Sequence, residues 1–279
     1  MKVVLADPAG ACYGVERALA LAREAALRPG NPHVSTLGPL IHNPIVVRDL
    51  ESAGVSVAGS VDEADDGVLV IRSHGVTREV LAEASAAEGL EVVDATCPHV
   101  ARVQREAQAM AADGRYVIVV GEPGHPEVEG IASYAGERSA VVERAVDLPD
   151  LPSDTRVGVV VQTTQSPALL REVEEALRER ISDVRVADTI CSATARRQQA
   201  AAEVAGSCDA MIVIGGRNSG NTRRLFELCA GLCPNSHHIE SPDEMDPGWF
   251  IGCETVGITA GASTPRSQIE SVMAVLGGL

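Results

Sequence analysis

The sequence contains very few aromatic residues. Two Phe, three Tyr and one Trp occur among 279 residues, although hydrophobic residues make up 45% of the chain. Binding of single-stranded nucleic acid by base stacking needs aromatic side chains, so the composition argues against a surface of that kind. The core must therefore be built from Val, Ala, Leu and Ile, which suits close-packed layers of helices and sheets.

Basic residues are scarce, and long apolar runs and nucleotide motifs are missing. The chain has 23 Lys and Arg against 39 Asp and Glu, a formal charge of −16, whereas nucleic acid and anionic membranes attract an excess of positive charge. No apolar run reaches the roughly 18 residues of a membrane span, and Asp7 comes too early for a signal peptide. Neither a Walker loop nor a dinucleotide fingerprint is present. We therefore expect a cytoplasmic protein with no nucleic-acid and no membrane partner, in which any anion site is local.

The chain repeats one pattern of strand, cysteine and helix. Two β-type runs, residues 92–97 and 186–191, end in Asp-x-x-Cys, and their cysteines lie 94 residues apart. The same offset carries residues 117–121 onto residues 211–215 without a gap. Cys12, followed by a helical pattern, begins the earliest copy. A Gly-x-x-x-His or Gly-x-x-x-Ser element occurs three times, at Gly38/His42, Gly121/His125 and Gly215/Ser219.

In each copy a third strand-like run ends in a polar loop. These loops carry His74, Thr163 and Ser263, although their spacing from the preceding cysteine drifts. Ligands of open α/β sheets bind at the carboxyl ends of the strands, where these residues would lie. Three ordered copies predict a pseudo-threefold α/β fold. The predicted units are residues 13–96, residues 97–190, and residues 191–279 together with residues 1–12.

Three of the seven cysteines occupy equivalent positions in the copies. Cys12, Cys97 and Cys191 each stand at an expected strand-to-helix junction, where the helix N-terminus stabilises the thiolate form that binds metals. Three convergent thiolates could hold zinc with an open position, or an iron–sulfur cluster in which one iron lacks a protein ligand. The residue types do not decide between these two, and three buried core cysteines are the interpretation without a ligand.

Polar side chains are expected around the cysteine centre. Histidine, hydroxyl and amide donors can bind an anion, and residues 218–221 open a helix whose N-terminus favours negative charge. Glu127 is the one carboxylate of the group and could deliver a proton, provided that burial keeps it protonated. The full set is His42, His74, His125, Glu127, Thr163, Ser219, Asn221 and Ser263.

The other cysteines are expected to be ordinary apolar residues. Cys229 shares an apolar helical face with Leu225, and Cys208 and Cys253 adjoin expected strands. A small apolar thiol needs no ligand to be buried. The alternative is a zinc site formed by Cys229, Cys233, His237 and His238.

Nine short motifs, spread over nearly the whole chain, are similar to those of a known protein family. They are Cys12-Tyr13-Gly14-Val15, His42-Asn43-Pro44, Ser73-His74-Gly75-Val76, Asp94-Ala95-Thr96-Cys97-Pro98, residues 124–130 (Gly-His-Pro-Glu-Val-Glu-Gly), Gln162-Thr163-Thr164, residues 190–194 (Ile-Cys-Ser-Ala-Thr), residues 218–222 (Asn-Ser-Gly-Asn-Thr) and residues 259–263 (Thr-Ala-Gly-Ala-Ser). The cysteine motifs and the His-Pro-Glu motif are the specific ones. On these motifs the chain resembles the 4-hydroxy-3-methylbut-2-enyl diphosphate reductase family, the LytB/IspH type.

The resemblance implies a trefoil of three α/β domains around a [4Fe-4S] cluster held by Cys12, Cys97 and Cys191. The open iron would bind the hydroxyl of an allylic diphosphate substrate, which two electrons and two protons remove as water to give isopentenyl and dimethylallyl diphosphates. The electrons would come from a ferredoxin- or flavodoxin-type donor. By resemblance, Glu127 would supply protons, His125 and Thr163 would position the hydroxyl, and the diphosphate would be held by His42, His74, Ser219, Asn221 and Ser263.

The chain departs from the family pattern at five positions. Ala9 and Ala11 stand where an Arg and an aromatic residue are usual, Tyr13 where a small residue is usual, Ser192 in place of a Tyr, and Gly220 in place of a Ser. The three equivalent cysteines and the acid are intact. A paralogue that reduces a different allylic diphosphate and a non-catalytic metal- or phosphate-binding protein are the two alternatives.

Overall fold

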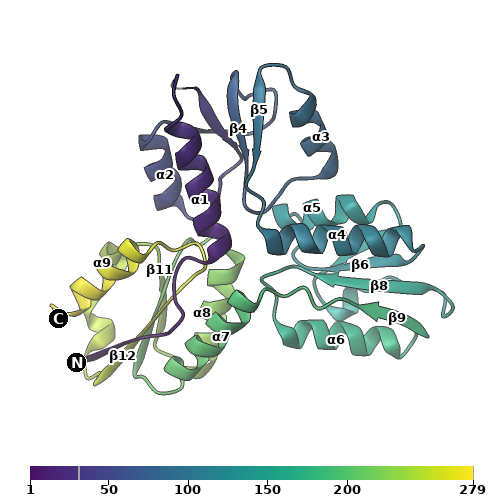
Figure 1. Cartoon of the computed structure of the whole chain (residues 1–279). Coiled ribbons are helices and arrows are strands. Elements are labelled where there is room, and N and C mark those ends of the chain that lie inside the picture. The colour runs from purple at the N-terminus through teal and green to yellow at the C-terminus, as the bar shows by residue number, and fades with distance from the viewer. Residues whose placement is uncertain (31, 279) are drawn as a thin grey trace. The chain divides into compact units, whose positions relative to one another are not determined.

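The computed structural model of the protein describes residues 1–30 and 32–278. Within these residues, twelve strands form three four-stranded sheets whose strand pairs are all parallel (Figure 1). Most of the strands are short and apolar, as expected for parallel strands covered on both faces, whereas β9 (Asp183–Val186) and β11 (Ser236–Ile239) also carry polar side chains. Helices connect them, so the prediction of an α/β fold is confirmed. Across this described part of the chain, no helix is long and apolar enough to span a membrane.

The first sheet is built from the segment after the earliest cysteine. Its strands are β2 (Val34–Leu37), β3 (Val55–Ala58), β4 (Gly67–Ile71) and β5 (Leu90–Asp94), in the order β3-β2-β4-β5. The helices of this segment are α1 (Tyr13–Ala26), α2 (Pro44–Ser52) and α3 (Arg78–Ala86). Val80 and Leu81 of α3 pack in one apolar cluster with Leu69 and Ile71 of β4. This burial fixes α3 on the sheet.

The second sheet shows how the sequence pattern places helices on two faces. Its strands are β6 (Tyr116–Val120), β7 (Ser139–Val142), β8 (Arg156–Val161) and β9 (Asp183–Val186), in the order β7-β6-β8-β9. Its helices are α4 (Pro98–Ala112), α5 (Pro126–Ala135) and α6 (Pro167–Arg178), with a short 3-10 helix, η1 (Ala145–Asp147). Because side chains alternate along a strand, Ile118 and Val120 pack with α6, whereas Val117 and Val119 pack with α4 and α5. Figure 1 shows these helices on opposite sides of the strands.

The third sheet combines both ends of the chain. Its strands are β10 (Ala210–Ile214), β11 (Ser236–Ile239), β12 (Thr255–Ala260) and β1 (Lys2–Leu5), in the order β11-β10-β12-β1. Its helices are α7 (Ser192–Ala205), α8 (Gly220–Leu232), α9 (Arg266–Leu276) and the 3-10 helices η2 (Pro242–Glu244) and η3 (Pro247–Phe250). Ile212 and Ile214 pack with α9, and Met211 and Val213 pack with α7 and α8. Alternate side chains of β10 thus pack against helices on opposite faces of the sheet, as those of β6 do in the second sheet.

All three sheets share one strand order. Counted along each copy of the pattern, the order is second, first, third, fourth, and β1 takes the fourth place of the third sheet beside β12. Each fourth strand leads into one of the equivalent cysteines: β1 into Cys12, β5 into Cys97 and β9 into Cys191. The repeat seen in the sequence is therefore a repeat of sheet topology.

Packing contacts divide the chain into two compact units. The first unit comprises Met1–Glu16, Ile41–Asp49 and Ser192–Leu279 and holds the third sheet, and the second comprises Arg17–Leu40 and Leu50–Cys191 and holds the other two sheets. The three domains with boundaries at 13–96, 97–190 and 191–279 plus 1–12 stay a prediction. The last of these boundaries, Leu279, lies outside the described residues.

A glycine at the start of β4 provides a test of the fold. Gly67 has φ +141°, and a Cβ there would lie 2.2 Å from the carbonyl oxygen of His33. Gly67→Ala is expected to lower the free energy of unfolding by about 1–3 kcal/mol, because backbone rather than a flexible side chain blocks the methyl group. In the matched control Gly231→Ala, the added methyl in α8 meets nothing within 4 Å, so a gain of about 0.5–1 kcal/mol is expected. Urea unfolding measures both, and an unchanged midpoint for Gly67→Ala would contradict the close approach.

Candidate functional site

Parallel strands bring the sequence-predicted residues to one edge of each sheet. The Gly-x-x-x-His and Gly-x-x-x-Ser elements follow the first strands β2, β6 and β10, and the loops with His74, Thr163 and Ser263 follow the third strands β4, β8 and β12. First and third strands are neighbours in all three sheets. Since the carboxyl ends of parallel strands share an edge, the two loops of each sheet begin next to one another.

The three equivalent cysteines form equivalent backbone hydrogen bonds. In each case the cysteine N–H donates to a carbonyl oxygen in the loop after the third strand of the sheet. The pairs are Cys12 to Ala262 at 3.0 Å, Cys97 to Ser73 at 2.9 Å, and Cys191 to Thr163 at 3.0 Å. The hydrogen bond therefore ties each cysteine backbone to the polar loop of its own sheet.

All three cysteines also stand directly before helices: Cys12 before α1, Cys97 before α4 and Cys191 before α7. The carbonyl oxygens of Cys12 and Cys97 accept the N–H groups of Glu16 and Ala101, both at 2.9 Å, which are the first helical bonds of α1 and α4. The three cysteines form no disulfide and are of intermediate exposure. The N–H groups of a helix start favour a negative charge nearby.

The second compact unit contains a buried acid bound to a threonine. Glu127, in the first turn of α5, is 2% exposed. Its Oε1 accepts the backbone N–H of Thr163 at 2.6 Å, and its Oε2 accepts the Thr163 hydroxyl at 2.9 Å. The Thr163 carbonyl in turn accepts the Cys191 N–H. The carboxyl group is thus one hydroxyl away from the loop that holds the cysteine, a geometry in which a proton can pass from acid to hydroxyl.

Two histidines lie beside this acid. His125 is the N-cap of α5, and its Nδ1 accepts the backbone N–H of Glu127 at 3.1 Å. In a neutral ring this bond leaves the proton on Nε2, which becomes a donor. The His74 ring meets the His125 ring edge-on, with centroids 5.7 Å apart. The second unit therefore brings together His74, His125, Glu127 and Thr163.

The first compact unit gathers the remaining polar residues of the predicted site. The Ser263 hydroxyl donates to the His42 carbonyl at 3.3 Å, and the Asn43 amide donates to the Ser263 carbonyl at 2.9 Å. Gly216 lies so close that a Cβ on it would be 2.5 Å from the His42 carbonyl oxygen. The Ser219 N–H donates to the Gly216 carbonyl at 3.0 Å. His42, Ser219 and Ser263 therefore lie at one place in this unit.

The start of α8 adds unpaired polar atoms to the same place. The Ser219 hydroxyl caps α8 by accepting the Thr222 N–H at 3.3 Å. Asn221 is 4% exposed, and its Nδ2 and Oδ1 are both buried without a hydrogen-bond partner. A buried polar group left in that state costs about 1–3 kcal/mol, which a polar ligand would remove. A helix N-terminus with an unsatisfied amide is well suited to an anion.

Sequence reasoning missed two buried polar residues, Asn43 in the first compact unit and Gln162 in the second. Asn43 is 1% exposed, and its Oδ1 accepts the Ile45 N–H at 3.1 Å at the start of α2. An Asn followed by a Pro at a helix start is an N-cap signal that could have identified it. Gln162 is fully buried; its Oε1 accepts the Glu122 N–H at 3.1 Å, and its Nε2 has no partner. No spacing rule singles out Gln162 within its motif.

Two of the remaining thiols differ from the three equivalent ones. Burial, with a smaller contribution from Cys233, raises the pKa of Cys208 to about 11. Burial also raises the pKa of Cys229 to about 12, with a smaller effect of Cys208. Burial therefore disfavours the thiolate form of both residues.

The alternative zinc site is wrong. Cys229 and Cys233 pack in an apolar cluster under the third sheet. The His237 ring stacks on Trp249 with centroids 3.7 Å apart, and His238 Nε2 lies 2.8 Å from the Gly215 carbonyl oxygen. Among the residues that the structure describes, Cys229, Cys233, His237 and His238 do not come together as a group that could hold a metal ion.

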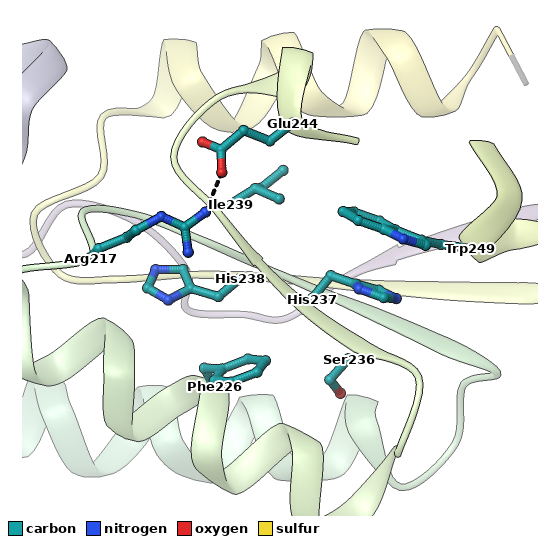
Figure 2. A pocket seen from close by; sticks show the side chains of 8 residues that line it. All are labelled: Arg217, Phe226, Ser236, His237, His238, Ile239, Glu244 and Trp249. Atoms are coloured by element: carbon teal, nitrogen blue, oxygen red, sulfur yellow. Dashed lines mark hydrogen bonds and ion pairs between the residues drawn. The ribbon is translucent and has the colours of Figure 1, made fainter. Parts of the chain in front are cut away.

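The two histidines instead line a surface pocket of about 370 Å³ at the edge strand β11. Figure 2 shows the His238 ring between Arg217 and Phe226, and His237 beside Trp249. An ion pair between Arg217 and Glu244 borders the pocket. The histidines are thus used in packing against other side chains and the backbone.

The class of protein follows from the repetition. It is an α/β enzyme in which each repeat contributes one cysteine that forms no disulfide and lies beside a polar loop, and one of these loops binds a buried acid. The family is LytB. The family model described as "LytB protein" matches residues 3–277, and the chain belongs to this family. It is a family of iron–sulfur oxidoreductases of isoprenoid biosynthesis, so the resemblance found in the motifs is confirmed.

The relatives match the chain over its length. The 4-hydroxy-3-methylbut-2-enyl diphosphate reductase of Pelobacter propionicus is 48% identical over 277 residues, which are 99% of this chain and 98% of the relative. That of Geobacter metallireducens is 48% identical over 273 residues, 98% of this chain and 96% of the relative.

Two solved structures are also similar. One is (E)-4-hydroxy-3-methyl-but-2-enyl diphosphate reductase, described as the terminal enzyme of the non-mevalonate pathway, with 42% identity, a TM-score of 0.74 and full coverage of both chains. The other is the E-1-hydroxy-2-methyl-but-2-enyl-4-diphosphate reductase of Plasmodium falciparum, with 26% identity and a TM-score of 0.92 over 99% of this chain and 87% of that one.

The pocket histidine His238 predicts a pH dependence of stability. Burial is the main cause that lowers its pKa, so below a pH of about 6.5 the unfolded chain binds more protons at this ring than the folded chain does. The stabilisation is present at higher pH and is lost as the pH falls. We expect His238→Gln to reduce the loss of unfolding free energy between pH 8 and pH 5.5. Urea unfolding at both pH values measures it against the exposed control His99→Gln; the same loss in both variants would contradict the prediction.

Proposed function

We propose that this chain binds a [4Fe-4S] cluster through Cys12, Cys97 and Cys191 and removes the hydroxyl of 4-hydroxy-3-methylbut-2-enyl diphosphate as water. The products are isopentenyl and dimethylallyl diphosphates. The observation that carries this proposal is a pair of hydrogen bonds from Thr163 to the buried Glu127 carboxyl group. The carbonyl oxygen of the same Thr163 accepts the backbone N–H of Cys191. This arrangement joins a buried proton source to the loop of a ligand cysteine.

The donor set fits an iron–sulfur cluster. The three cysteines form no disulfide, are equivalent in topology, are tied by the same backbone bond and stand directly before helices. Iron–sulfur clusters are held by soft cysteine thiolates. Cys12, Cys97 and Cys191 would hold such a cluster, which would supply electrons and one iron without a protein ligand.

Protonation falls to Glu127 and Thr163. Reduction of an allylic alcohol to a hydrocarbon consumes two electrons and two protons: one proton leaves with the hydroxyl as water, and the other is added to the allylic carbon skeleton. When Glu127 carries a proton, its O–H can donate to the Thr163 oxygen over the same 2.9 Å contact, and the Thr163 O–H is then available to donate to the substrate hydroxyl. His125, with its Nε2 proton, supplies a further donor to the same oxygen.

The diphosphate is assigned to His42, Ser219, Asn221 and Ser263 of the first unit, with His74 of the second. Asn221 supports this, because its buried amide lacks a partner. The N-terminus of α8 adds backbone N–H groups that face a negative charge. Such a local site suits a chain whose formal charge is −16, since neutral donors bind the anion without a basic surface.

The electrons are assigned to a ferredoxin- or flavodoxin-type donor. Iron–sulfur clusters accept and release electrons one at a time, and the reaction needs two. A donor that delivers single electrons at low potential therefore matches the chemistry.

The test is turnover by Glu127→Gln against the matched control Glu129→Gln. Glu129 is exposed and lies two residues further along α5. With anaerobically purified protein and a chemically reduced donor, Glu127→Gln is expected to keep the cluster absorbance but lose about 10²–10⁴-fold in kcat, the usual contribution of a general acid. Glu129→Gln is expected to stay near wild type.

Two results would overturn the proposal. Full turnover by Glu127→Gln would remove the proton-donor role. A colourless wild-type preparation that contains zinc and no iron would instead support a metal- or phosphate-binding protein without this reaction. Turnover of another allylic diphosphate alone would identify a paralogue with a different substrate.

A further inference from the structure

Arg197 is a buried arginine whose side chain donates hydrogen bonds to the backbone just before Cys12. It lies in α7 and is 5% exposed. Its Nε and Nη2 both donate to the Gly10 carbonyl, at 2.9 and 2.7 Å, and Nη2 also donates to the Ala11 carbonyl at 3.1 Å. Burying a guanidinium is costly unless its donors are satisfied. Because the buried guanidinium of Arg197 binds two neighbouring carbonyls, it fixes their positions.

The same arginine is anchored at the start of its own helix. Its Nη1 donates to the Ala193 carbonyl at 2.9 Å, two residues beyond Cys191 in the sequence. The planar fork of the guanidinium therefore sets the distance between the first turn of α7 and the segment before Cys12. Lysine has a single point of attachment and cannot hold three carbonyls in one plane.

The segment before Cys12 is confined from the other side as well. The N–H groups of Gly10 and Cys12 donate to the carbonyls of Ala260 and Ala262 at 3.2 and 3.0 Å. Gly10 has φ +82°, and a Cβ on it would lie 2.7 Å from Ile269 Cδ1. The N–H groups thus bind the end of β12, and the carbonyls bind Arg197. The backbone just before Cys12 is therefore held by hydrogen bonds from two directions.

A second arginine has the corresponding relation to the next cysteine. Arg17 lies in α1, the helix after Cys12, and its Nη1 and Nη2 donate to the carbonyls of Thr96 and Asp94 at 3.2 and 3.4 Å. Those carbonyls stand just before Cys97. In two copies of the repeat, an arginine of a post-cysteine helix thus holds the backbone before another cysteine. The repetition indicates a role connected with the cysteines rather than with one local fold.

We propose that Arg197 is a positioning residue that fixes the Cys12 thiol for metal ligation. This inference rests on the proposed function, because it takes Cys12 as a cluster ligand. Loss of the guanidinium frees Gly10 and Ala11, and the thiol of Cys12 then moves while the backbone bonds of Cys97 and Cys191 stay in place. The effect is therefore confined to one of the three ligands.

The test compares Arg197→Gln and Arg197→Lys with Arg196→Gln. Arg196 is the exposed neighbour on the same helix. In the anaerobically loaded full-length protein, chelator-driven iron release is expected to be about tenfold faster in both Arg197 variants, the size of effect typical of residues that orient metal ligands. The EPR signal of the reduced cluster is expected to shift in these variants and not in Arg196→Gln.

A second readout needs no cluster. In the iron-free full-length chain, iodoacetamide alkylation followed by peptide mass spectrometry reports each thiol separately. The rate at Cys12, relative to Cys97 and Cys191, is expected to rise about fivefold in Arg197→Gln and Arg197→Lys, because local opening exposes only that segment. Equal acceleration at all three cysteines, or none, would overturn the inference. If the wild type binds no iron, the proposed function fails, and this alkylation contrast still decides the role of Arg197.

Discussion

The site depends on a backbone hydrogen bond that occurs three times, from a cysteine N–H to the loop after the third strand of its sheet. The fourth strand carries the cysteine to the sheet edge, and the bond holds it beside the third strand's loop. Because the strand order is the same in all three sheets, the same bond delivers a thiol, a polar loop and a helix start at each edge. The N-terminal strand β1 completes the third sheet and so makes Cys12 equivalent to the other two.

The proposed diphosphate site would bind its anion with neutral groups and few basic ones. The chain is strongly acidic, and the proposed diphosphate residues are histidines, hydroxyls and an amide at a helix start. These donors are held by buried contacts such as the Asn43 bond to the Ser263 carbonyl. Burying the Asn221 amide without a hydrogen-bond partner lowers the stability of the fold and leaves a polar group available to a ligand. Arg17 and Arg197, by contrast, donate hydrogen bonds to backbone carbonyls just before Cys97 and Cys12.

Much of this arrangement could be predicted from the sequence. The offset of 94 residues between Cys97 and Cys191 predicted the repeat, and alternating Val and Ile runs predicted the strands. The strand order explains why the loop residues His74, Thr163 and Ser263 matter even though their spacing drifts: loop length changes the spacing, whereas the strand end fixes the place. Gln162 was missed because its partner, the Glu122 N–H, lies far away in the sequence, which no local pattern reports. The sequence does carry an N-cap signal at Asn43, but it does not report the contact of Asn43 with the distant Ser263. The zinc alternative failed because close sequence spacing of Cys and His says nothing about which face of a sheet or helix each side chain occupies.

The most direct test of the account is the iron and sulfide content of anaerobically purified cysteine variants. The wild type is expected to contain about four irons per chain, the content of a [4Fe-4S] cluster. Cys12→Ser, Cys97→Ser and Cys191→Ser are each expected to lose most of the iron and sulfide, and the control Cys253→Ser is expected to keep it. Retention of a full cluster in any one of the first three variants would contradict the equivalence of the three thiols.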